Sequence, residues 1–337
     1  MPIQNYPTVF ECTEMTAAVN KLPARPFFFK PLFEVRGVKT TTVSLDIRKG
    51  RIVLIGDSER NTAPESLAGR GAKREWKHLS CAHLAQSDTL APEDLQNVRA
   101  FGSTEPISVA AVYNDKMQQL KDNLAATLEF HRLGAIKGVV LDADGTTVLH
   151  DIFNTFGAAK KTLDISFPKT AADDANPILT SILKAKRHVE AAMGGTPFDH
   201  IECIIGSDAY DMLTSHKLVR EYFERWLSNR ENFGNNDYRK RGFPYGGLTF
   251  VERSDVVGGQ TMVAAKKGHV YPVGPGIFKQ YHAPADWMET VNTIGLEYYA
   301  RMDEKPKGRG FDLEVQSNPL TLCTFPEALI ELNFKAA

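Results

Sequence analysis

The strongest structural signal in this sequence is a long amphipathic helix. From Ser108 to Leu133, apolar side chains recur in steps of three and four residues, which places them on one helical face; they are Val109, Val112, Tyr113, Met117, Leu120, Leu124 and Leu128. We expect His131 and Arg132 on the polar side and Gly134 at the end of the helix. A helix of this length measures roughly 40 Å, so the chain is predicted to fold around a rod that is long for a globular domain.

Composition predicts a folded protein with more than one core. The chain has 337 residues, which is long for a single core and natural for two. Its 40 basic and 41 acidic side chains give a net charge of −1, whereas a protein that grips nucleic acid usually carries a clear positive excess. A surface that only tolerates DNA needs no such excess.

The cysteines and the N-terminal residues indicate the compartment. The four cysteines lie far apart and form no CxxC pair, which predicts no disulfide framework and suggests a reducing environment. Residues 1–16 lack a basic region followed by an apolar run, so we expect no signal peptide. No apolar run reaches the length of a membrane span. These features are typical of a soluble cytoplasmic protein.

The leading third of the chain is not expected to form a core by itself. Residues 1–35 hold prolines that prevent a continuous helix or a central strand. They also hold phenylalanines whose burial is worth roughly 1.5–3 kcal/mol each, namely Phe27, Phe28, Phe29 and Phe33. Residues 36–100 read as a β-ribbon, with strands at 43–47 and 52–55 joined by a turn at Lys49-Gly50, followed by a polar loop and a returning segment. An isolated ribbon is marginal in water, so this region is expected to need a partner surface.

Residues 171–300 read as a mixed α/β domain. A helix is expected from a cap near Asp174 to Gly194, followed by a buried strand at 200–205 and two more helices. Further strand segments are expected at 246–255, 259–274 and 290–304. The tail, residues 308–334, is expected to add two strands around Pro319 and Pro326.

The stretch Lys137–Asp151, KGVVLDADGTTVLHD, resembles the nucleophile motif of haloacid-dehalogenase phosphatases. On that hypothesis Asp142 attacks phosphorus, Asp144 is the general acid, and Mg²⁺ bridges them to the phosphate. The context favours another structure, because Asp144-Gly145 stands between two apolar β runs and is a strong signal for a type I′ hairpin turn. The acidic pair 173–174, which could imitate the distal metal site, is explained by a helix cap. We therefore predict a structural turn at Asp144 and Gly145.

Three further clusters are weaker candidates for a site. His78, Cys81 and His83 form half of a possible metal site, but no second cluster supplies the remaining ligands. The basic runs at 239–241 and 305–310 could meet phosphates, although short charge runs are usually solvated loops. No phosphate-binding loop, dinucleotide motif or nucleophile elbow occurs. The sequence therefore predicts no catalytic residue, metal ligand or cofactor, and favours a subunit made for assembly over an enzyme.

The segments LAPEDLQNVRAFGS (Leu90–Ser103), Ala126–Gly157 and His282–Leu332 together resemble the major capsid protein E family of tailed bacteriophages, the lambda-like shell proteins. The similarity runs in one order from about Phe27 to Leu332. It implies an α+β fold of the Hong Kong 97 type, with an N-terminal arm, an extended loop, a peripheral domain with a long spine helix, and an axial domain. In that family the LDADG segment is a structural hairpin, in agreement with the predicted turn.

The resemblance also implies a division of the chain. Residues 1–35 would be the arm, 36–104 the extended β-ribbon loop, 105–170 with 301–337 the peripheral domain, and 171–300 the axial domain. Neighbouring subunits would then cover the apolar surface of the leading third. The side chains expected first at contacts between subunits are Phe27, Phe28, Phe29, Arg70, Lys73, Arg74 and Trp76.

The implied function is that of a major capsid protein, a structural head protein and not an enzyme. Its copies would form hexamers and pentamers in an icosahedral shell that encloses double-stranded DNA without sequence-specific binding. Scaffold, portal and decoration proteins are expected partners, with no cofactor and no membrane. Assembly is expected in the host bacterial cytoplasm, and the assembled protein in the virion. The alternatives are a Mg²⁺-dependent phosphatase that uses Asp142 and Asp144, and a small adaptor protein that is a stable monomer.

Overall fold

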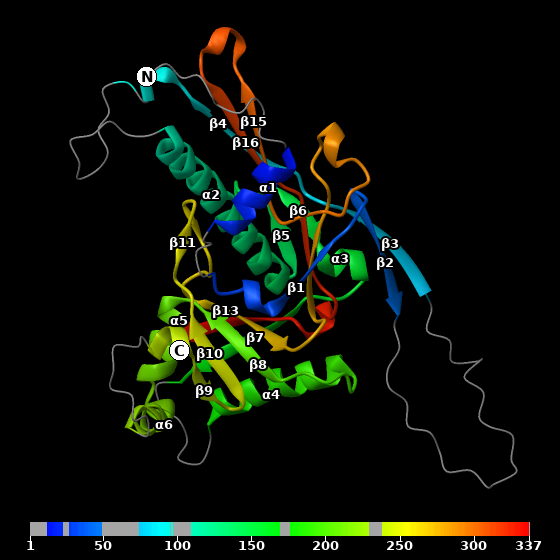
Figure 1. The fold of residues 1–337 in the computed structure, drawn as a ribbon. Helices are drawn as coiled ribbons and strands as arrows, with labels where there is room; N and C mark the ends of the chain where they lie inside the picture. The colour runs from blue at the N-terminus through cyan, green and yellow to red at the C-terminus, as the bar shows by residue number, and fades with distance from the viewer. Residues whose placement is uncertain are drawn as a thin grey trace, which may run out of the picture. The chain divides into compact units, whose positions relative to one another are not determined.

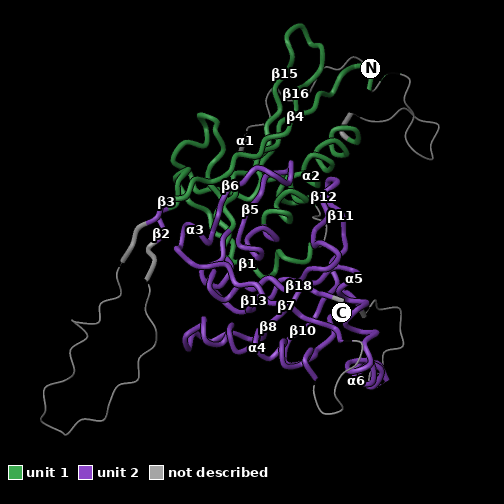
Figure 2. The backbone as a smooth tube through the Cα atoms, turned by 180° about the vertical axis from the view of Figure 1, so that it is seen from behind, with its two compact units in different colours: residues 1–43, 78–131, 279–321 green, residues 44–77, 132–278, 322–337 purple. Residues whose placement is uncertain are grey.

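The computed structural model describes residues 12–22, 27–48, 74–94, 96, 109–168, 176–228 and 238–336. The chain divides into two compact units, each made from three pieces that are distant in sequence (Figure 2). Unit 1 holds residues 1–43, 78–131 and 279–321. Unit 2 holds residues 44–77, 132–278 and 322–337.

Unit 1 combines helices with two three-stranded sheets (Figure 1). Its helices are α1 (Cys12–Lys21) and most of α2 (Val109–Lys137). One sheet has the antiparallel order β15-β16-β4, with bounds Tyr299–Glu304, Phe311–Ser317 and Leu84–Leu90. The other has the order β1-β14-β17, with bounds Phe33–Gly37, Phe278–His282 and Pro319–Cys323. Short 3₁₀ turns cover residues 30–32, 92–94, 288–290 and 306–308.

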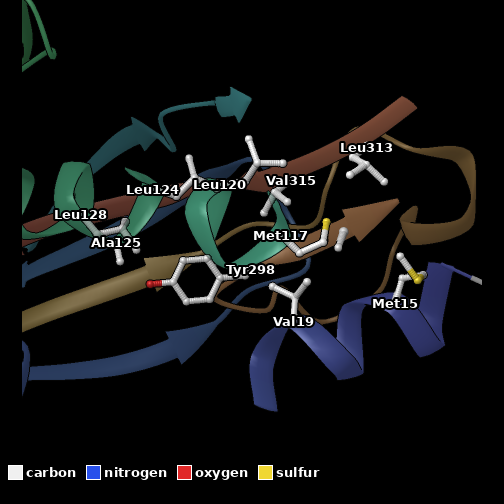
Figure 3. Packing of buried hydrophobic residues seen from close by; sticks show 11 residues of the cluster. Met15, Val19, Met117, Leu120, Leu124, Ala125, Leu128, Tyr298, Leu313 and Val315 are labelled. Carbon is white, nitrogen blue, oxygen red and sulfur yellow. The ribbon is translucent and has the colours of Figure 1, made fainter. Parts of the chain in front are cut away.

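The core of unit 1 forms between α1, α2 and the strands β15 and β16 (Figure 3). Its buried side chains are Met15, Val19, Met117, Leu120, Leu124, Ala125, Leu128, Tyr298, Ala300, Leu313 and Val315. The predicted stripe from Met117 to Leu128 is therefore the face of α2 that is buried, which confirms the long amphipathic helix. Burial of side chains of this size contributes roughly 1.5–3 kcal/mol each.

Strands β2 (Thr42–Arg48) and β3 (Arg74–Ser80) form a separate two-stranded ribbon. The strand expected at 43–47 is confirmed. The turn expected at Lys49-Gly50 and the strand expected at 52–55 lie outside the described residues.

Unit 2 is organised around a six-stranded mixed sheet with the order β7-β18-β13-β8-β10-β9. Neighbours β18 and β7, and β10 and β8, are parallel, whereas the other pairs are antiparallel. The bounds, in sheet order, are Lys161–Phe167, Ile330–Ala336, Lys267–Val273, His200–Ile205, Leu248–Glu252 and Phe243–Tyr245. The apolar run at the end of β8 is fully buried, as expected for an inner strand with both faces covered.

Helices and short hairpins complete unit 2. The helices are α3 (Ile152–Phe156), α4 (Pro177–Met193), α5 (Ser207–Ser215), α6 (Lys217–Ser228) and α7 (Tyr238–Arg241). The hairpins pair β5 (Val139–Leu141) with β6 (Val148–Asp151), and β11 (Val256–Val257) with β12 (Gln260–Thr261). Helix α4 packs on β7. Among all described helices, none is both long and apolar enough to cross a membrane.

The end of α2 differs from the expectation. The helix continues through Gly134 to Lys137, and Gly138, with φ of 83°, follows its last residue. A Cβ at position 134 would lie 2.8 Å from the Cα of Val140, so Gly134 permits close packing of β5 rather than ending the helix. His131 and Arg132, expected on the polar side, are only 2% and 1% exposed.

Two helix and strand boundaries also differ. The N-cap expected near Asp174 is Asn176, whose side chain accepts the N–H of Leu179 at 3.0 Å, with Pro177 in the first turn. Gly194, with φ of 57°, ends α4 as expected. The strand expected over 290–304 begins only at Tyr299. The tail forms three strands rather than two.

The two units do not follow the predicted domain boundaries. Strand β7 and the C-terminal strand β18 were assigned to the peripheral domain, 105–170 with 301–337, yet both pair within the six-stranded sheet of unit 2. Residues 279–300, assigned to the axial domain 171–300, belong to unit 1. The boundaries of the two units depend on which distant segments pair in a sheet, such as β7 with β18. Periodicity within one segment does not show which segment it pairs with.

Candidate assembly elements

A buried lysine attaches α1 to α2. Lys121 is 2% exposed, and its Nζ donates hydrogen bonds to the carbonyls of Val19 at 2.8 Å and Leu22 at 2.7 Å. These carbonyls lie at the C-terminal end of α1, where backbone acceptors lack helical partners and a cation favours the helix dipole. The same Nζ lies 5.2 Å from the ring of Tyr298. Burial holds the pKa of Lys121 below its ordinary value, and the nearby carboxylate of Glu297 offsets only part of this effect.

A buried glutamate attaches the next described segment. Glu129 lies about two turns further along α2 and is 3% exposed. Its Oε1 accepts the backbone N–H of Phe29 at 2.7 Å. We call Lys121 and Glu129 the arm clamp. Because both bond to backbone groups, they determine the path of the arm and not the identity of its side chains.

The phenylalanines of the arm lie largely against their own unit. Phe29 is 1% exposed, and Phe27 packs against the core of unit 1. Phe28 is half-buried, and its ring meets that of Phe29 edge-on at 5.1 Å between centroids. The chain itself buries Phe29, and a contact of this residue with a neighbouring subunit stays a prediction. Contact of Phe27 and Phe28 with a neighbour stays a prediction.

The remaining residues expected at subunit contacts belong to the ribbon region. Arg70 and Lys73 lie outside the described residues. Arg74 and Trp76 are in β3, but only their backbone is described. All four therefore remain predicted contact residues.

The Asp-Gly segment forms the turn of a hairpin. Strands β5 and β6 pair antiparallel on either side of it, which confirms the predicted hairpin. The turn is longer than the expected type I′ turn: the N–H of Asp142 donates to the Thr147 carbonyl, and the N–H of Gly145 donates to the Asp142 carbonyl, both at 2.9 Å. Only Gly145 has a positive φ, 71°, whereas a type I′ turn would require one at Asp144 as well.

The carboxylate of Asp144 is engaged within this turn. It accepts the hydroxyl of Thr147 at 2.6 Å and the N–H groups of Thr146 and Thr147 at 2.8 and 2.9 Å. These bonds, first that from the Thr147 hydroxyl, hold the pKa of Asp144 well below its usual range. A carboxylate held by three contacts of its own loop fixes the turn, and nothing in this geometry supports the phosphatase hypothesis for Asp142 and Asp144.

The residues of the possible metal half-site, His78, Cys81 and His83, are not arranged as metal ligands in the described structure. His83 Nδ1 lies 2.8 Å from Asn318 Oδ1, and burial raises the pKa of Cys81 to about 11. His78 is exposed on β3. Over the described ranges, no three His, Cys, Asp or Glu side chains are placed to hold a metal ion.

The basic runs have structural partners. Segment 305–310 is the turn between β15 and β16, closed by the Lys305 N–H, which donates to the Gly310 carbonyl at 2.9 Å. The Lys305 ammonium also lies 3.1 Å from the carboxylate of Asp312. In the other run, Arg239 lies 3.8 Å from Glu252.

Unit 2 contains a cluster of ionisable groups in which Glu331 and His269 are buried while Lys160 and Lys267 are about half exposed. Glu331 of β18 forms ion pairs with Lys160 and Lys267. Its burial opposes ionisation, but the hydrogen bonds from the two lysines outweigh that effect and lower its pKa to about 2. His269 of β13 is buried in the same cluster; burial, reinforced by the charge of Lys137, lowers its pKa to about 3. Burial also lowers the pKa of Lys137 to about 8.

Sequence reasoning missed the arm clamp because charged residues were read as solvent-exposed. The spacing contained the signal. Lys121 lies four residues before Ala125 and seven before Leu128, which places it on the buried stripe of α2. A lysine inside an apolar stripe predicts either a snorkelling side chain or a buried partner, and the partner here is the backbone of a segment about 100 residues away.

The chain is similar to known phage capsid proteins in both sequence and fold. A family model described as phage major capsid protein E matches residues 11–334. The chain is 26% identical to the major capsid protein of Pseudomonas phage KPP10, with 98% of each chain covered. It is 24% identical to that of Salmonella phage Felix O1, with 97% of each covered. Its fold is similar to the capsid of Ralstonia phage GP4, with a TM-score of 0.54 at 11% identity over 93% of each chain. The fold is thus the α+β capsid fold of the Hong Kong 97 type.

Proposed function

This chain belongs to the phage major capsid protein E family, and we propose that its copies close into the icosahedral shell that encloses the double-stranded DNA of a tailed bacteriophage. The family is a structural one. The observation that carries the proposal is the family match over residues 11–334, which takes in segments of both units.

The ribbon supports assembly by contact with a second copy. In the described part of the chain, β2 pairs only with β3, so the outer edge of each strand presents N–H and C=O groups to other chains. A two-stranded ribbon gains stability when it lies on another surface. We assign the ribbon, with Arg70, Lys73, Arg74 and Trp76 of the extended loop, to contact with a neighbouring subunit. Deleting residues 58–73, which lie outside the described ranges, should leave the axial domain folded and prevent shell closure.

The charge of the chain suits a container wall. A net charge of −1 gives little general attraction to phosphates, so DNA can move past the inner surface during packaging. Many weak contacts between copies add to a stable shell while each stays reversible during assembly. Scaffold, portal and decoration proteins are the further partners that this function needs, and the host bacterial cytoplasm is the place of assembly.

Electron microscopy of the chain expressed alone tests the proposal. Negatively stained material should contain shells of megadalton mass, or hexamers and pentamers, and velocity sedimentation should give the same species. A stable monomer at micromolar concentration would contradict shell formation and favour the adaptor hypothesis. Asp142→Asn separates the proposal from the phosphatase hypothesis, because only that hypothesis predicts that the variant loses phosphate release from a model ester while the particle stays intact.

A further inference from the structure

Exposed apolar side chains are unevenly distributed over the described residues. They are Val35, Val148, Tyr222, Val256, Met288, Val291, Ile294 and Leu296. Four of these eight lie within residues 288–296, where Met288 is 90% exposed and Ile294 is 60% exposed. Scattered exposed apolar residues are ordinary, but their concentration in one short segment points to an interaction surface.

Strand β1 brings a fifth member to this group. The N–H of Gly295 donates to the Val38 carbonyl at 2.9 Å, so the two segments run side by side. A Cβ at Gly37 would lie 2.6 Å from Cγ2 of Ile294. Because side chains two residues apart on a strand point to the same face, Val35 shares the face that Gly37 turns toward Ile294. The name apolar face is used below for Val35, Met288, Val291, Ile294 and Leu296.

The segment under the apolar face is fixed by buried groups. Trp287 and Tyr299 are buried and meet edge-on, with ring centroids 6.2 Å apart. The hydroxyl of Thr290 lies 2.7 Å from the Ala285 carbonyl, and the Tyr299 hydroxyl accepts the N–H of Leu296 at 3.0 Å. Buried rings and hydroxyl groups thus hold the backbone of this segment, while its exposed positions carry the four aliphatic side chains together with Glu289, Asn292 and Thr293. Because the backbone is held from below, the exposed surface is preorganised for contact.

An open groove of about 640 Å³ lies beside the apolar face, in the same unit. Val291 lines it together with Ala82, Pro284 and Ala285, and Lys39 and His83 stand among its polar lining. The groove therefore offers a recess for an apolar side chain from a partner, directly next to an exposed apolar surface.

The charges around the apolar face occur in both signs. Glu34 and Arg36 flank Val35 and form an ion pair. Glu289 follows Met288 and lies 3.9 Å from Arg301, and Lys39 and Asp286 line the groove. The rim thus holds three acidic and three basic side chains. A rim with charges of one sign only would repel the same rim on a second copy of the chain. A rim with both signs can pack against a second copy without this repulsion.

We propose that the apolar face packs against a second copy of this chain in the shell. This inference rests on the proposed function and adds a surface outside the ribbon and the arm. Five side chains form a contact well below the roughly 1,200 Å² that a stable one-to-one complex buries. Such a contact suits an assembly of identical copies, in which many weak contacts act together, better than a separate partner bound on its own.

Accessibility of an introduced thiol tests the proposal. Met288→Cys is compared with Val256→Cys, an exposed position in unit 2, by maleimide labelling and peptide mass spectrometry of unassembled chains and purified shells. Labelling at position 288 should slow by roughly tenfold or more in shells formed by this chain alone, as expected for a desolvated contact. The Val256→Cys rate corrects for any general effect of assembly on labelling.

A surface variant provides the second measurement. Met288→Ser, Val291→Thr and Ile294→Thr combined should abolish shells while circular dichroism and protease resistance stay unchanged, and Val256→Thr should assemble normally. Unchanged labelling at position 288 in shells overturns the proposal, as does protection that appears only after another phage protein is added. Both results leave the capsid function intact, because shells are present. If the unaltered chain stays a stable monomer at micromolar concentration, the capsid function itself fails. Should the triple variant misfold, the labelling result decides.

Discussion

The two units bury charged side chains, but they neutralise them in different ways. In unit 1, the arm clamp residues Lys121 and Glu129 bond to carbonyl and N–H groups of the backbone, which do not titrate. In unit 2, Glu331 is paired with lysines, and His269 lies in the same cluster. This difference predicts that loss of a clamp residue changes the path of the arm. The stability of unit 2, in contrast, should depend on the charge states of the groups around Glu331 and His269.

The largest effect is expected for Lys121→Met. The variant keeps an apolar stem of similar length but leaves the carbonyls of Val19 and Leu22 without their donor. Loss of two charged hydrogen bonds in a buried site should destabilise the folded chain by about 3 kcal/mol. Urea unfolding measures this loss, and limited proteolysis should show faster cleavage in the arm.

Lys116→Met is the matched control for this prediction. Lys116 lies on the same helix and also donates to a backbone carbonyl, that of Thr89 at 2.7 Å, but it is less buried and its ion pairs with Asp88 and Asp94 are partly exposed. Pairs of this kind contribute about 1 kcal/mol or less. Equal losses for the two variants would show that the full burial of Lys121 gives its hydrogen bonds no greater effect on stability.

Glu331→Gln is expected to have the next largest effect. The neutral amide leaves Lys160 and Lys267 close together, beside buried His269, without a compensating carboxylate. Because both lysines are about half exposed, the loss of stability should be near 2 kcal/mol, less than for a fully buried pair. Hydrogen exchange should locate the loss in β13 and β18. An effect confined to the arm would contradict the separation between the units.

The stability of unit 2 is expected to decrease in acid, because its buried histidine His269 resists protonation. His269 has its pKa lowered from 6.5 to about 3, so below pH 6.5 the unfolded chain binds a proton that the folded chain does not. Stability should therefore fall as pH decreases from 6.5, by up to about 1.4 kcal/mol per pH unit. Glu331, with a pKa near 2, adds a loss only below its unfolded value of 4.5.

His269→Phe separates these contributions. The variant removes the titrating group and keeps a ring of similar size. Unfolding free energies measured between pH 7 and pH 5 should decline less steeply for His269→Phe than for the unaltered chain; a smaller decline remains because burial also lowers the pKa of His150. Parallel pH profiles would show that another group causes the acid response.

Local patterns predicted much of this fold. The stripe from Met117 to Leu128 and the Asp-Gly hairpin were both readable because a single segment carries each signal. Gly134 was misread because a glycine that ends a helix and a glycine that admits a neighbouring strand look alike in sequence. Only the close approach of Val140 separates the two cases.

Contacts between distant segments account for what the sequence did not show. Strand β18 pairs with β7 across about half of the chain, so the two compact units do not coincide with the predicted domain boundaries, which stay a prediction. The apolar face was missed because residues 290–298 were expected to continue a strand, whereas buried Thr290 and Tyr299 hold them in a turn. The strand at 43–47 was predicted because its alternation is a local property, whereas its described partner β3 begins in a segment that was expected as loop.

The smallest effect on stability is expected for Asp144→Ala. This variant removes an exposed charge, whereas the variants of Lys121 and Glu331 remove buried ones. The carboxylate bonds only within its turn to Thr146 and Thr147, so their amides should exchange faster while the protection of the six-stranded sheet stays unchanged. The folded pKa of Asp144 lies below the unfolded value of 3.8, so the contribution of this carboxylate is present above that pH and is lost in acid. The unaltered chain should therefore approach the exchange rates of Asp144→Ala at low pH, and Thr147→Val should show part of the same change. A loss of global stability as large as that of Glu331→Gln would mean that exposure does not decide how much a charge matters in this chain.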